Sequence, residues 1–489
     1  MGLLTLFAGI LLPWIGGTFW LMFADAHFNK NSKINRFRQA GYGFFLGYAI
    51  LFLAIIGSNA MTGVVSWPQL MGFLLLFSAS GAIAAWLSPK QPAITALTPE
   101  TTSSAWVTTF LVCAMVLMAV HLVFIAVEIY TQPLYPWDAW LAWVYRAKAW
   151  FLAGGMVGIT SPTDWATAAS ASIYSIDAWV YPLFASVIPY WAALGLGHWS
   201  ETLINLPVLF AGLALGMALY GQCREYGLGV SASLIACYLL FSIPLFGTHL
   251  ALAGYADIWM AGFAGLGFVA VMRGAILRNN GRGSAYQVVM GFLMIFFSIW
   301  VKNEGAVWFL AALAMLILAV CRPRVPILIV LATVIVALAV FALGLTYIEI
   351  PLIGKLGLVE GHLAIPFIGN FKMEVHDVRY VYWDNLVNMG SWNLLWVAVA
   401  GSLLLAFGSP GSPSGDNSRR TALSFVLVFV ATQLFIFGFT NQGLWADTYT
   451  AINRLPLHFV PALLFTVMIA VHTSLPKNAN NQAVRNEDA

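Results

Sequence analysis

The sequence contains few charged residues. Only 8% of its 489 residues are charged and 61% are hydrophobic, whereas an average soluble domain is about 25% charged. This composition excludes a water-soluble globular protein, because no core could hide so much apolar surface. The apolar residues form continuous runs, which also excludes an outer-membrane barrel built from short alternating strands. The sequence therefore predicts an all-α, polytopic membrane protein.

Cysteine and N-terminal basic residues are also scarce. The four cysteines form no CxxC pair, so neither a disulfide framework nor a cysteine metal site is indicated. The first residues, Met1-Gly2-Leu3-Leu4, lack a basic region and an obvious cleavage site. They predict a first spanning helix instead of a signal peptide. The net charge of +3 is small, and no nucleic-acid partner is expected.

Apolar segments long enough to span a membrane are numerous. A span needs about 20 residues, and about thirteen segments qualify. They are 3–23, 41–62, 68–87, 105–127, 201–221, 229–247, 256–273, 285–301, 304–320, 326–346, 387–407, 421–440 and 454–473. A further stretch, 181–197, is short and contains two prolines, so its path is ambiguous.

The charge of the loops resolves this ambiguity. Cytoplasmic loops are enriched in Lys and Arg, and the basic loops lie at 30–38, 273–282, 322–324 and 419–420. All four share one side only if 181–197 is interfacial or re-entrant. The N-terminus is then outside and the C-terminus cytoplasmic, in a cell inner or plasma membrane. Most acidic residues fall on the extracytoplasmic side, which is therefore predicted to be the working face.

Three regions follow from this topology. Residues 1–104 are predicted to be N-terminal transmembrane helices, and 105–475 a second transmembrane module. The module has outer segments at 128–200 and 347–386. Residues 476–489 are polar and are predicted to be a disordered cytoplasmic tail. The second outer segment is charged but lacks a recognised metal-ligand spacing, so it is interpreted as a solvated loop.

Asp138 is the most conspicuous acid, because it stands between Trp137 and Trp140 where a long apolar helix ends. The following tryptophans recur at helical spacing and predict an amphipathic helix at the membrane surface. Arg146 and Lys148 lie on its other face. Asp138 is either an N-cap beside an aromatic anchor or a carboxylate facing a cavity, with two cations placed to hold an anionic head group.

Other polar residues recur at the predicted outer ends of spans, and each has a structural alternative. Caps, turns, exposed ion pairs and snorkelling side chains account for such residues in many proteins. Ionisable residues at membrane depth otherwise indicate function. His249 and His458, near span ends, are predicted to be structural. The functional candidates are Asp177, Tyr181, Tyr255, Asp257, Lys302, Asn303, Glu304 and Arg454.

The order and sidedness of these motifs resemble the glycosyltransferase C (GT-C) superfamily over roughly 105–475. The similarity is greatest to protein-mannosyltransferase-like and aminoarabinose-transferase-like members. The residues that carry it are Asp138, Arg146-Ala147-Lys148, Tyr181-Pro182-Leu183, Gly254-Tyr255-Ala256-Asp257, Lys302-Asn303-Glu304-Gly305 and Asn453-Arg454-Leu455. Many relatives have two adjacent acids in the first outer loop, whereas Ala139 follows Asp138 here.

The resemblance implies an enzyme that moves a sugar from a polyprenyl-phosphate donor to a glycan, lipid or protein acceptor, usually with inversion. It assigns the general base to Asp138. Asp257, Glu304 or Asp177 would supply a second carboxylate. It assigns phosphate binding to Arg146, Lys148, Lys302 and Arg454, and substrate binding to Asp177, Tyr181, Tyr255 and Asn303. No cofactor is certain, and a divalent cation is left open.

Two other functions compete with this interpretation. One is a transporter or flippase of lipid-linked sugars, which would place polar groups near the membrane midplane. The other is an enzyme resembling O-antigen ligases or polymerases, with a polyprenyl-diphosphate donor and an outer loop rich in Arg and His. The clustering of polar residues at the outer ends of spans favours an enzyme over a transporter, and the segment 347–386 is only a fair candidate for the loop of a ligase-like enzyme.

Overall fold

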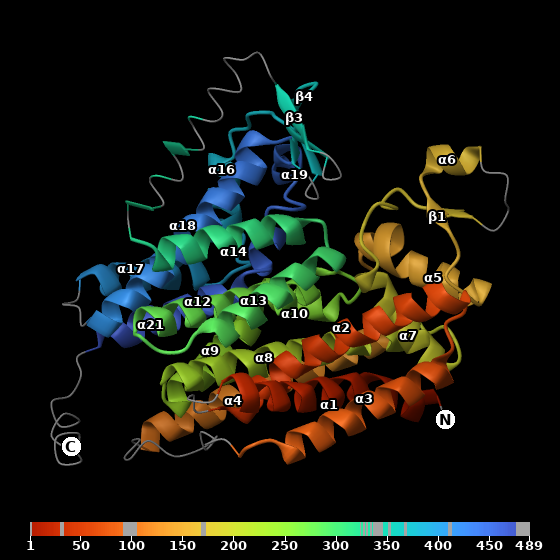
Figure 1. Cartoon of the computed structure of the whole chain (residues 1–489), viewed down its shortest axis with the longest axis horizontal. Helices are drawn as coiled ribbons and strands as arrows, with labels where there is room; N and C mark the ends of the chain where they lie inside the picture. The colour runs from red at the N-terminus through yellow and green to blue at the C-terminus, as the bar shows by residue number, and fades with distance from the viewer. Residues whose placement is uncertain are drawn as a thin grey trace.

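The computed structural model describes residues 2–29, 34–90, 105–167, 173–322, 346–350, 354–365, 369–408 and 413–475, with residues 324, 325, 328, 331, 332 and 335. Most of this chain is helical, and the long helices run side by side in a bundle (Figure 1). The predicted all-α membrane class is confirmed. Seven helices are long and apolar enough to cross a membrane, or eight if one bent pair counts as a span.

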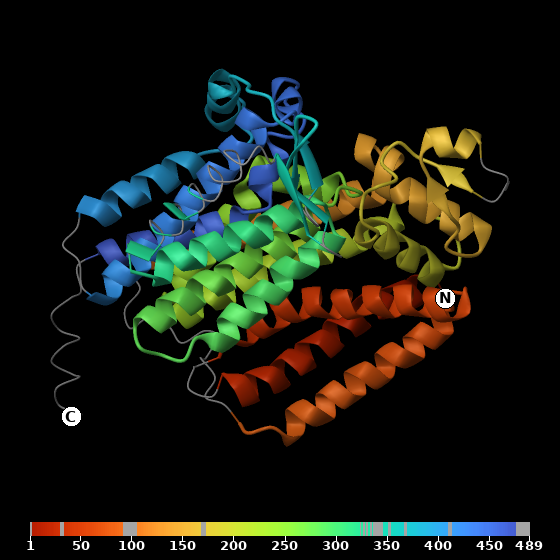
Figure 2. The same cartoon turned by 45° about the horizontal axis from the view of Figure 1, so that its top comes forward.

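The N-terminal helices form a layer against the rest of the bundle, shown in red and orange in Figure 2. Glycines let the first two pack backbone to backbone, because a Cβ at Gly47 would lie 1.8 Å from the Pro13 carbonyl oxygen. Such small residues allow close approach between membrane helices. The helices of this layer are α1 (Gly2–Phe28), α2 (Arg36–Thr62) and α3 (Trp67–Leu87). The next helix, α4 (Ala105–Thr131), packs against the central helices instead.

The centre of the bundle is the continuous helical segment Asp257–Asn279. Its most apolar stretch is 94% buried, more than any other candidate span. The central elements are α8 (Leu206–Tyr226), α9 (Val230–Ser242), α10 (Pro244–Ala251), α11 (Asp257–Met260), η3 (Ala261–Gly265), α12 (Leu266–Asn279), α13 (Ala285–Phe297), η4 (Ser298–Trp300) and α14 (Glu304–Val320). Helices α9 and α10 are the bent pair, with an angle of 63°.

The C-terminal helices complete the bundle on its other side. They are α16 (Arg379–Trp383), η5 (Asp384–Asn388), α17 (Leu395–Gly408), α18 (Pro413–Phe439), α19 (Gly443–Asp447), α20 (Arg454–Leu457) and α21 (Val460–Ser474). The expected spans other than 326–346 overlap helices. Those at 285–301, 304–320, 387–407 and 454–473 overlap apolar helices of only 10–17 residues, so the count of thirteen is not confirmed. Most of 326–346 and all of 476–489 lie outside the described residues.

Short elements form a lobe at one end of the bundle, drawn in gold in Figure 1. They are η1 (Ala139–Trp143), α5 (Val144–Ala153), β1 (Ile159–Thr160), α6 (Pro162–Ala166), β2 (Tyr174–Ser175), α7 (Phe184–Leu196) and η2 (Leu203–Asn205). Helix α7 has 13 residues, which at ~1.5 Å per residue is too short for a core of ~30 Å. Its length fits the expectation that 181–197 does not span.

The outer segment 347–386 contains a four-stranded antiparallel sheet, so its interpretation as a solvated charged loop was wrong. The strands are β3 (Tyr347–Ile350), β4 (Gly354–Val359), β5 (His362–Ile365) and β6 (Gly369–Lys372), paired in chain order. Glu360 and Gly361 both have positive φ and join β4 to β5 in a two-residue turn. Positive φ at both positions suits the right-handed twist of a hairpin.

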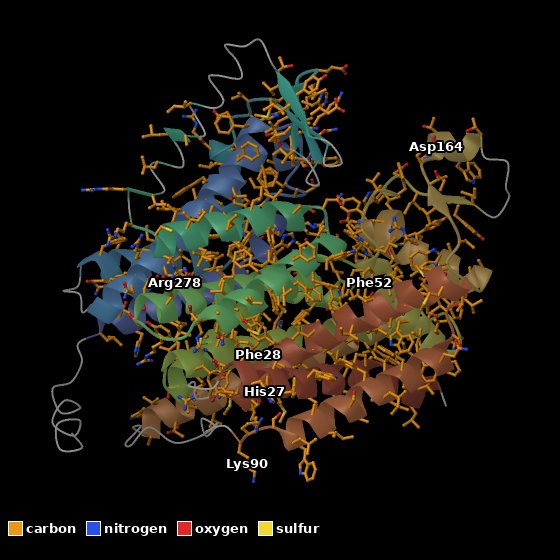
Figure 3. All side chains as sticks on the ribbon, in the orientation of Figure 1. His27, Phe28, Phe52, Lys90, Asp164 and Arg278 are labelled. Atoms are coloured by element: carbon orange, nitrogen blue, oxygen red, sulfur yellow. The ribbon has the colours of Figure 1, made fainter. Side chains whose placement is uncertain are left out.

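An aromatic cluster joins the N-terminal helices to the central helix. Phe44 of α2 stacks on Trp259 with ring centroids 5.8 Å apart, and Phe45 packs edge-on against Phe263 at 5.5 Å. A Cβ at Gly262 would lie 1.9 Å from the Phe45 ring, so only glycine fits there. The N-terminal helices are therefore part of the core that supports the central helix. Phe52, from the same helix α2, lies inside the bundle (Figure 3).

The two ends of the bundle differ in the groups they expose. Asp164 marks the gold lobe at one end, and Arg278 lies at the opposite end (Figure 3). The central helix runs between them, beginning at Asp257 and passing Arg273 near its end. These ends are called the Asp257 end and the Arg273 end below.

Candidate functional site

Asp257 is the centre of an ion cluster at the Asp257 end. It is the first residue of α11 and is fully buried. Its carboxylate accepts from Lys302 Nζ at 3.2 Å and from Arg454 Nε and Nη2 at 3.1 and 2.8 Å. It also lies 2.8 Å from His458 Nε2. A buried carboxylate is costly unless it is paired and hydrogen-bonded, so these contacts keep Asp257 ionised inside the bundle.

The turn before α11 brings Asp257 close to the segment that carries Asp138. Gly254 has φ 112°, a conformation that disfavours other residues. A Cβ at Gly254 would also lie 2.8 Å from the Ala139 side chain. Glycine is therefore needed both for the turn and for close approach to the residue that follows Asp138.

Asp138 reaches the same cluster from the gold lobe. Its Oδ2 lies 2.6 Å from Arg454 Nη2, and its side chain is 25% exposed. It makes no side-chain cap bond to the π-helical turn η1 that follows it, so the N-cap interpretation does not hold. Single π-helical turns are rare in proteins, and those that occur are often found at functional sites. Asp138 is thus a partly exposed acid held by a cation.

Arg454 joins the two acids. It begins α20 and lies with its guanidinium carbon 4.5 Å from the centre of the Tyr255 ring. A guanidinium over an aromatic face gains a cation–π contact, which helps to orient the fork toward Asp138 and Asp257. The side chain is 17% exposed. Arg454 is therefore a bridge between the buried and the accessible parts of the cluster.

Lys302 and Glu304 close another side of the cluster. Lys302 is buried, 3.5 Å from Glu304 Oε1, and its Nζ lies 6.0 Å from the centre of the Trp143 ring. The Glu304 side chain is 24% exposed. Its Oε2 is buried without a hydrogen-bond partner among the described residues. Tyr181 packs its ring against Trp143, and burial together with the Glu304 charge raises its pKa.

Two histidines and a tryptophan belong to the site and were not expected there. His458 contacts Asp257 through Nε2 and receives a hydrogen bond at Nδ1 from the Trp308 indole at 3.2 Å. His249 Nε2 lies 3.8 Å from Asp257. The available signal was spacing, because His458 stands four residues after Arg454 and shares its helical face.

Other predicted site residues are engaged elsewhere. Arg146 is buried and donates to the carbonyl oxygens of Trp179 and Tyr181, both at 3.0 Å. Burial lowers its pKa to about 10, which leaves it charged at neutral pH. Lys148 pairs with Glu201 at 2.7 Å on a half-exposed surface. The structure therefore does not place either cation in contact with the cluster.

Asp177 and Asn303 are both exposed. No hydrogen bond or ion pair joins the Asp177 side chain to the ion cluster in the part of the chain that the structure describes. Asn303 stands between the two clustered residues Lys302 and Glu304 but makes no cap bond to α14. Tyr255 and Tyr181, by contrast, lie against the cluster through Arg454 and Trp143. The structure thus divides the four predicted substrate residues into two pairs.

Two small hollows, each with room for about one water molecule, lie in this part of the molecule. One is lined in part by Val144, Ile188, Tyr255 and Trp259. The other lies where the end of α4 meets residues 251–253. None of the ionised residues of the cluster lines either hollow.

The cluster offers general-base and anion-binding chemistry. In the described part of the chain, no group of three or more His, Cys, Asp or Glu residues is arranged to hold a metal ion. No protein-family model, curated protein or solved structure matches this chain. The fold and the site define a polytopic membrane protein with an ion cluster at one end of its apolar helices.

Proposed function

We propose that the protein is a glycosyltransferase that moves a sugar from a polyprenyl-phosphate donor to an acceptor hydroxyl on the extracytoplasmic side of the membrane. The observation that carries this proposal is the link from Asp138 through Arg454 to buried Asp257 and Lys302. It combines one accessible carboxylate with two fixed cations at the end of an apolar bundle. The resemblance to GT-C enzymes supports the same assignment.

The reaction uses Asp138 as general base. The acceptor oxygen attacks the anomeric carbon, and its proton moves to Asp138. The bond from the anomeric carbon to the phosphate oxygen breaks, and its electrons leave with the phosphate. Attack opposite the leaving group inverts the anomeric centre. Positioned general bases contribute about 10²–10⁴-fold to such reactions.

The two clustered cations act on the donor phosphate. The leaving phosphate is anionic and needs positive charge in place of a proton. Arg454 and Lys302 supply this charge, while Asp257 holds both in place. The apolar chain of the donor accounts for a site at the membrane surface. Exposed Tyr135, Trp137 and Trp140 beside Asp138 fit the aromatic belt of a membrane interface.

A transporter of lipid-linked sugars is the second candidate, because α9 and α10 form a broken span. Broken helices in transporters present free backbone groups to a substrate cavity. Here the Ser242 carbonyl accepts from Asn393 Nδ2, and Leu245 N–H donates to the Ser391 carbonyl. From Ile258 to Met272 the central helix carries only apolar residues and glycine. These features favour the enzyme.

The test is sugar transfer by purified protein in liposomes supplied with polyprenyl-phosphate sugars. Asp138→Asn is expected to fold normally and to lose about 10²–10⁴-fold in turnover, because the amide cannot accept the proton. Asp164→Asn is the matched control, since it removes an exposed acid without an assigned role from the same outer segment. Normal turnover by Asp138→Asn would overturn the assignment. Transfer only from a diphosphate donor would favour the ligase-like or polymerase-like alternative.

A further inference from the structure

Arg454 is shared between two carboxylates that differ in burial. Its Nε and Nη2 donate to Asp257 Oδ2 at 3.1 and 2.8 Å. The same Nη2 lies 2.6 Å from Asp138 Oδ2. Asp257 is fully buried, whereas a quarter of the Asp138 side chain is exposed. One guanidinium nitrogen therefore serves a fixed partner and an accessible one.

The Asp257 side of this bridge is fixed. Lys302 and His458 both contact Asp257 Oδ1, on the opposite oxygen from Arg454. The Trp308 indole can only donate, so His458 Nδ1 must accept. The proton of neutral His458 therefore lies on Nε2 and is donated to Asp257. Displacing Arg454 from Asp257 would leave a buried carboxylate with fewer partners, which is costly.

The Asp138 side is exchangeable. In the described part of the chain, its carboxylate forms an ion pair with Arg454 alone, and it caps no helix. Water reaches both partners of this pair. Ion pairs that remain accessible to water are weak, because solvation competes with the contact.

The two terminal nitrogens of the Arg454 guanidinium, Nη1 and Nη2, are suited to bind an anionic phosphate. Among the described residues, Nη1 has no hydrogen-bond or ion-pair partner, while Nη2 carries the bond to Asp138. Arginine binds phosphate through two adjacent nitrogens. A phosphate on Nη1 and Nη2 would take the position that Asp138 now holds.

We propose that Asp138 and the donor phosphate compete for Arg454, so that donor binding releases Asp138 from Nη2 and frees it to act as base. This inference rests on the proposed transferase function. While Arg454 Nη2 holds Asp138 Oδ2, that oxygen is engaged and is not free to take the proton of the acceptor hydroxyl. Once the phosphate occupies Arg454, Asp138 takes the acceptor proton while the anomeric carbon–oxygen bond to phosphate breaks. The base thus becomes effective only after the donor has bound.

The charge balance is compatible with this exchange. Asp138, Asp257 and Glu304 face Lys302 and Arg454, so the cluster itself carries one excess negative charge. Arg146, on the helix after η1, adds a positive charge that is bonded to carbonyl oxygens and to no described acid. A phosphate therefore binds most favourably where it can replace a carboxylate on its cation, and the replaceable carboxylate is Asp138.

The test measures binding of farnesyl phosphate, a short isoprenyl phosphate, to purified full-length protein in detergent by calorimetry. Asp138→Asn is expected to bind it roughly two- to fivefold more tightly, the size of one exposed ion pair. Arg454→Lys is expected to bind it more weakly, because it loses the two-nitrogen edge. Asp164→Asn removes the same charge from an exposed position of the same segment that has no role in the site, and its affinity is expected to be unchanged.

The outcomes separate this inference from the proposed function. Unchanged or weaker binding by Asp138→Asn overturns the competition, as does equal tightening by Asp164→Asn, which would indicate a general charge effect. Asp138→Ala checks the result if the asparagine forms new bonds, and melting curves establish that each variant is folded. Retained sugar transfer by Asp138→Asn would instead overturn the base role, whatever its affinity for the probe.

Discussion

Two ion clusters lie at opposite ends of the central helix, and they differ in access to the surface. Asp257 and Arg273 are 16 positions apart in one helix, or about 24 Å at 1.5 Å per residue. At the Arg273 end, Arg38 pairs with Asp25 and Glu225, and Arg273 also pairs with Glu225. These four side chains are at most 5% exposed.

The cluster at the Asp257 end also consists of acidic and basic side chains, but the protein does not cover it completely. Asp257 and Lys302 are buried as deeply as the residues of the other cluster, yet Asp138, Glu304 and Arg454 reach the surface. The cluster at the Arg273 end also has two acids for two cations, whereas the Asp257 end has three acids for two. The closed cluster is suited to holding α1 and α2 against α8 and α12. The open cluster is suited to a ligand.

The largest expected effect is on the closed cluster. Arg38→Ala leaves Asp25 and Glu225 buried without their shared cation, which should lower stability by about 3–5 kcal/mol. Thermal unfolding of the purified protein measures this. Lys148→Ala is the control, because its pair with Glu201 is half-exposed and worth at most ~1 kcal/mol. Equal losses from the two variants would contradict the distinction between closed and open pairs.

The next effect concerns the helix between the clusters. Gly262→Ala places a methyl group against the Phe45 ring and should cost about 1–3 kcal/mol by overpacking. Because Gly262 lies in the turn after α11, the shift should also disturb Asp257 and weaken donor binding. The combined variant Gly262→Ala, Phe45→Ala should recover binding if this contact carries the effect. Unchanged binding by the single variant would show that packing of the N-terminal helices against the central helix does not affect the site.

The sequence predicted the helices well and the site in part. Long apolar runs are sufficient to identify spans, and the sidedness of polar residues brought Asp138, Asp257 and Arg454 to one end. The spacing of residues along the sequence could not show which group each basic side chain contacts in the folded protein. Arg146 faces carbonyl oxygens and Lys148 faces Glu201, both distant in sequence. The sheet of β3 to β6 escaped because its strands have only 4 to 6 residues each, too few for a clear strand pattern in the sequence.

His458 shows why the remaining part of the site was missed. A single histidine in an apolar run gives no sign of its partners, and Trp308 and Asp257 are 150 and 201 residues away from it. The signal becomes visible only when Arg454 and His458 are considered as neighbours on one helical face. Asp257, Trp308 and the Arg454–His458 pair come from three separate segments and meet only in the folded protein. No local sequence pattern specifies this meeting.

The smallest expected effect on stability tests how the open cluster is oriented. Trp308→Phe removes the indole donor to His458 Nδ1, at about 0.5–1.5 kcal/mol for one hydrogen bond plus a modest packing loss. With Nδ1 released, His458 can carry its proton on either ring nitrogen, so its hydrogen bond to Asp257 is no longer fixed. Binding of farnesyl phosphate by Trp308→Phe should therefore weaken about two- to tenfold, the size of one hydrogen bond, because Asp257 holds Arg454 less firmly. His458→Gln, whose amide can still donate to Asp257, should bind the probe as the native protein does. If Trp308→Phe also binds it unchanged, the Trp308 hydrogen bond does not set the proton position on His458, and the fixed side of the Arg454 bridge depends on Lys302 alone.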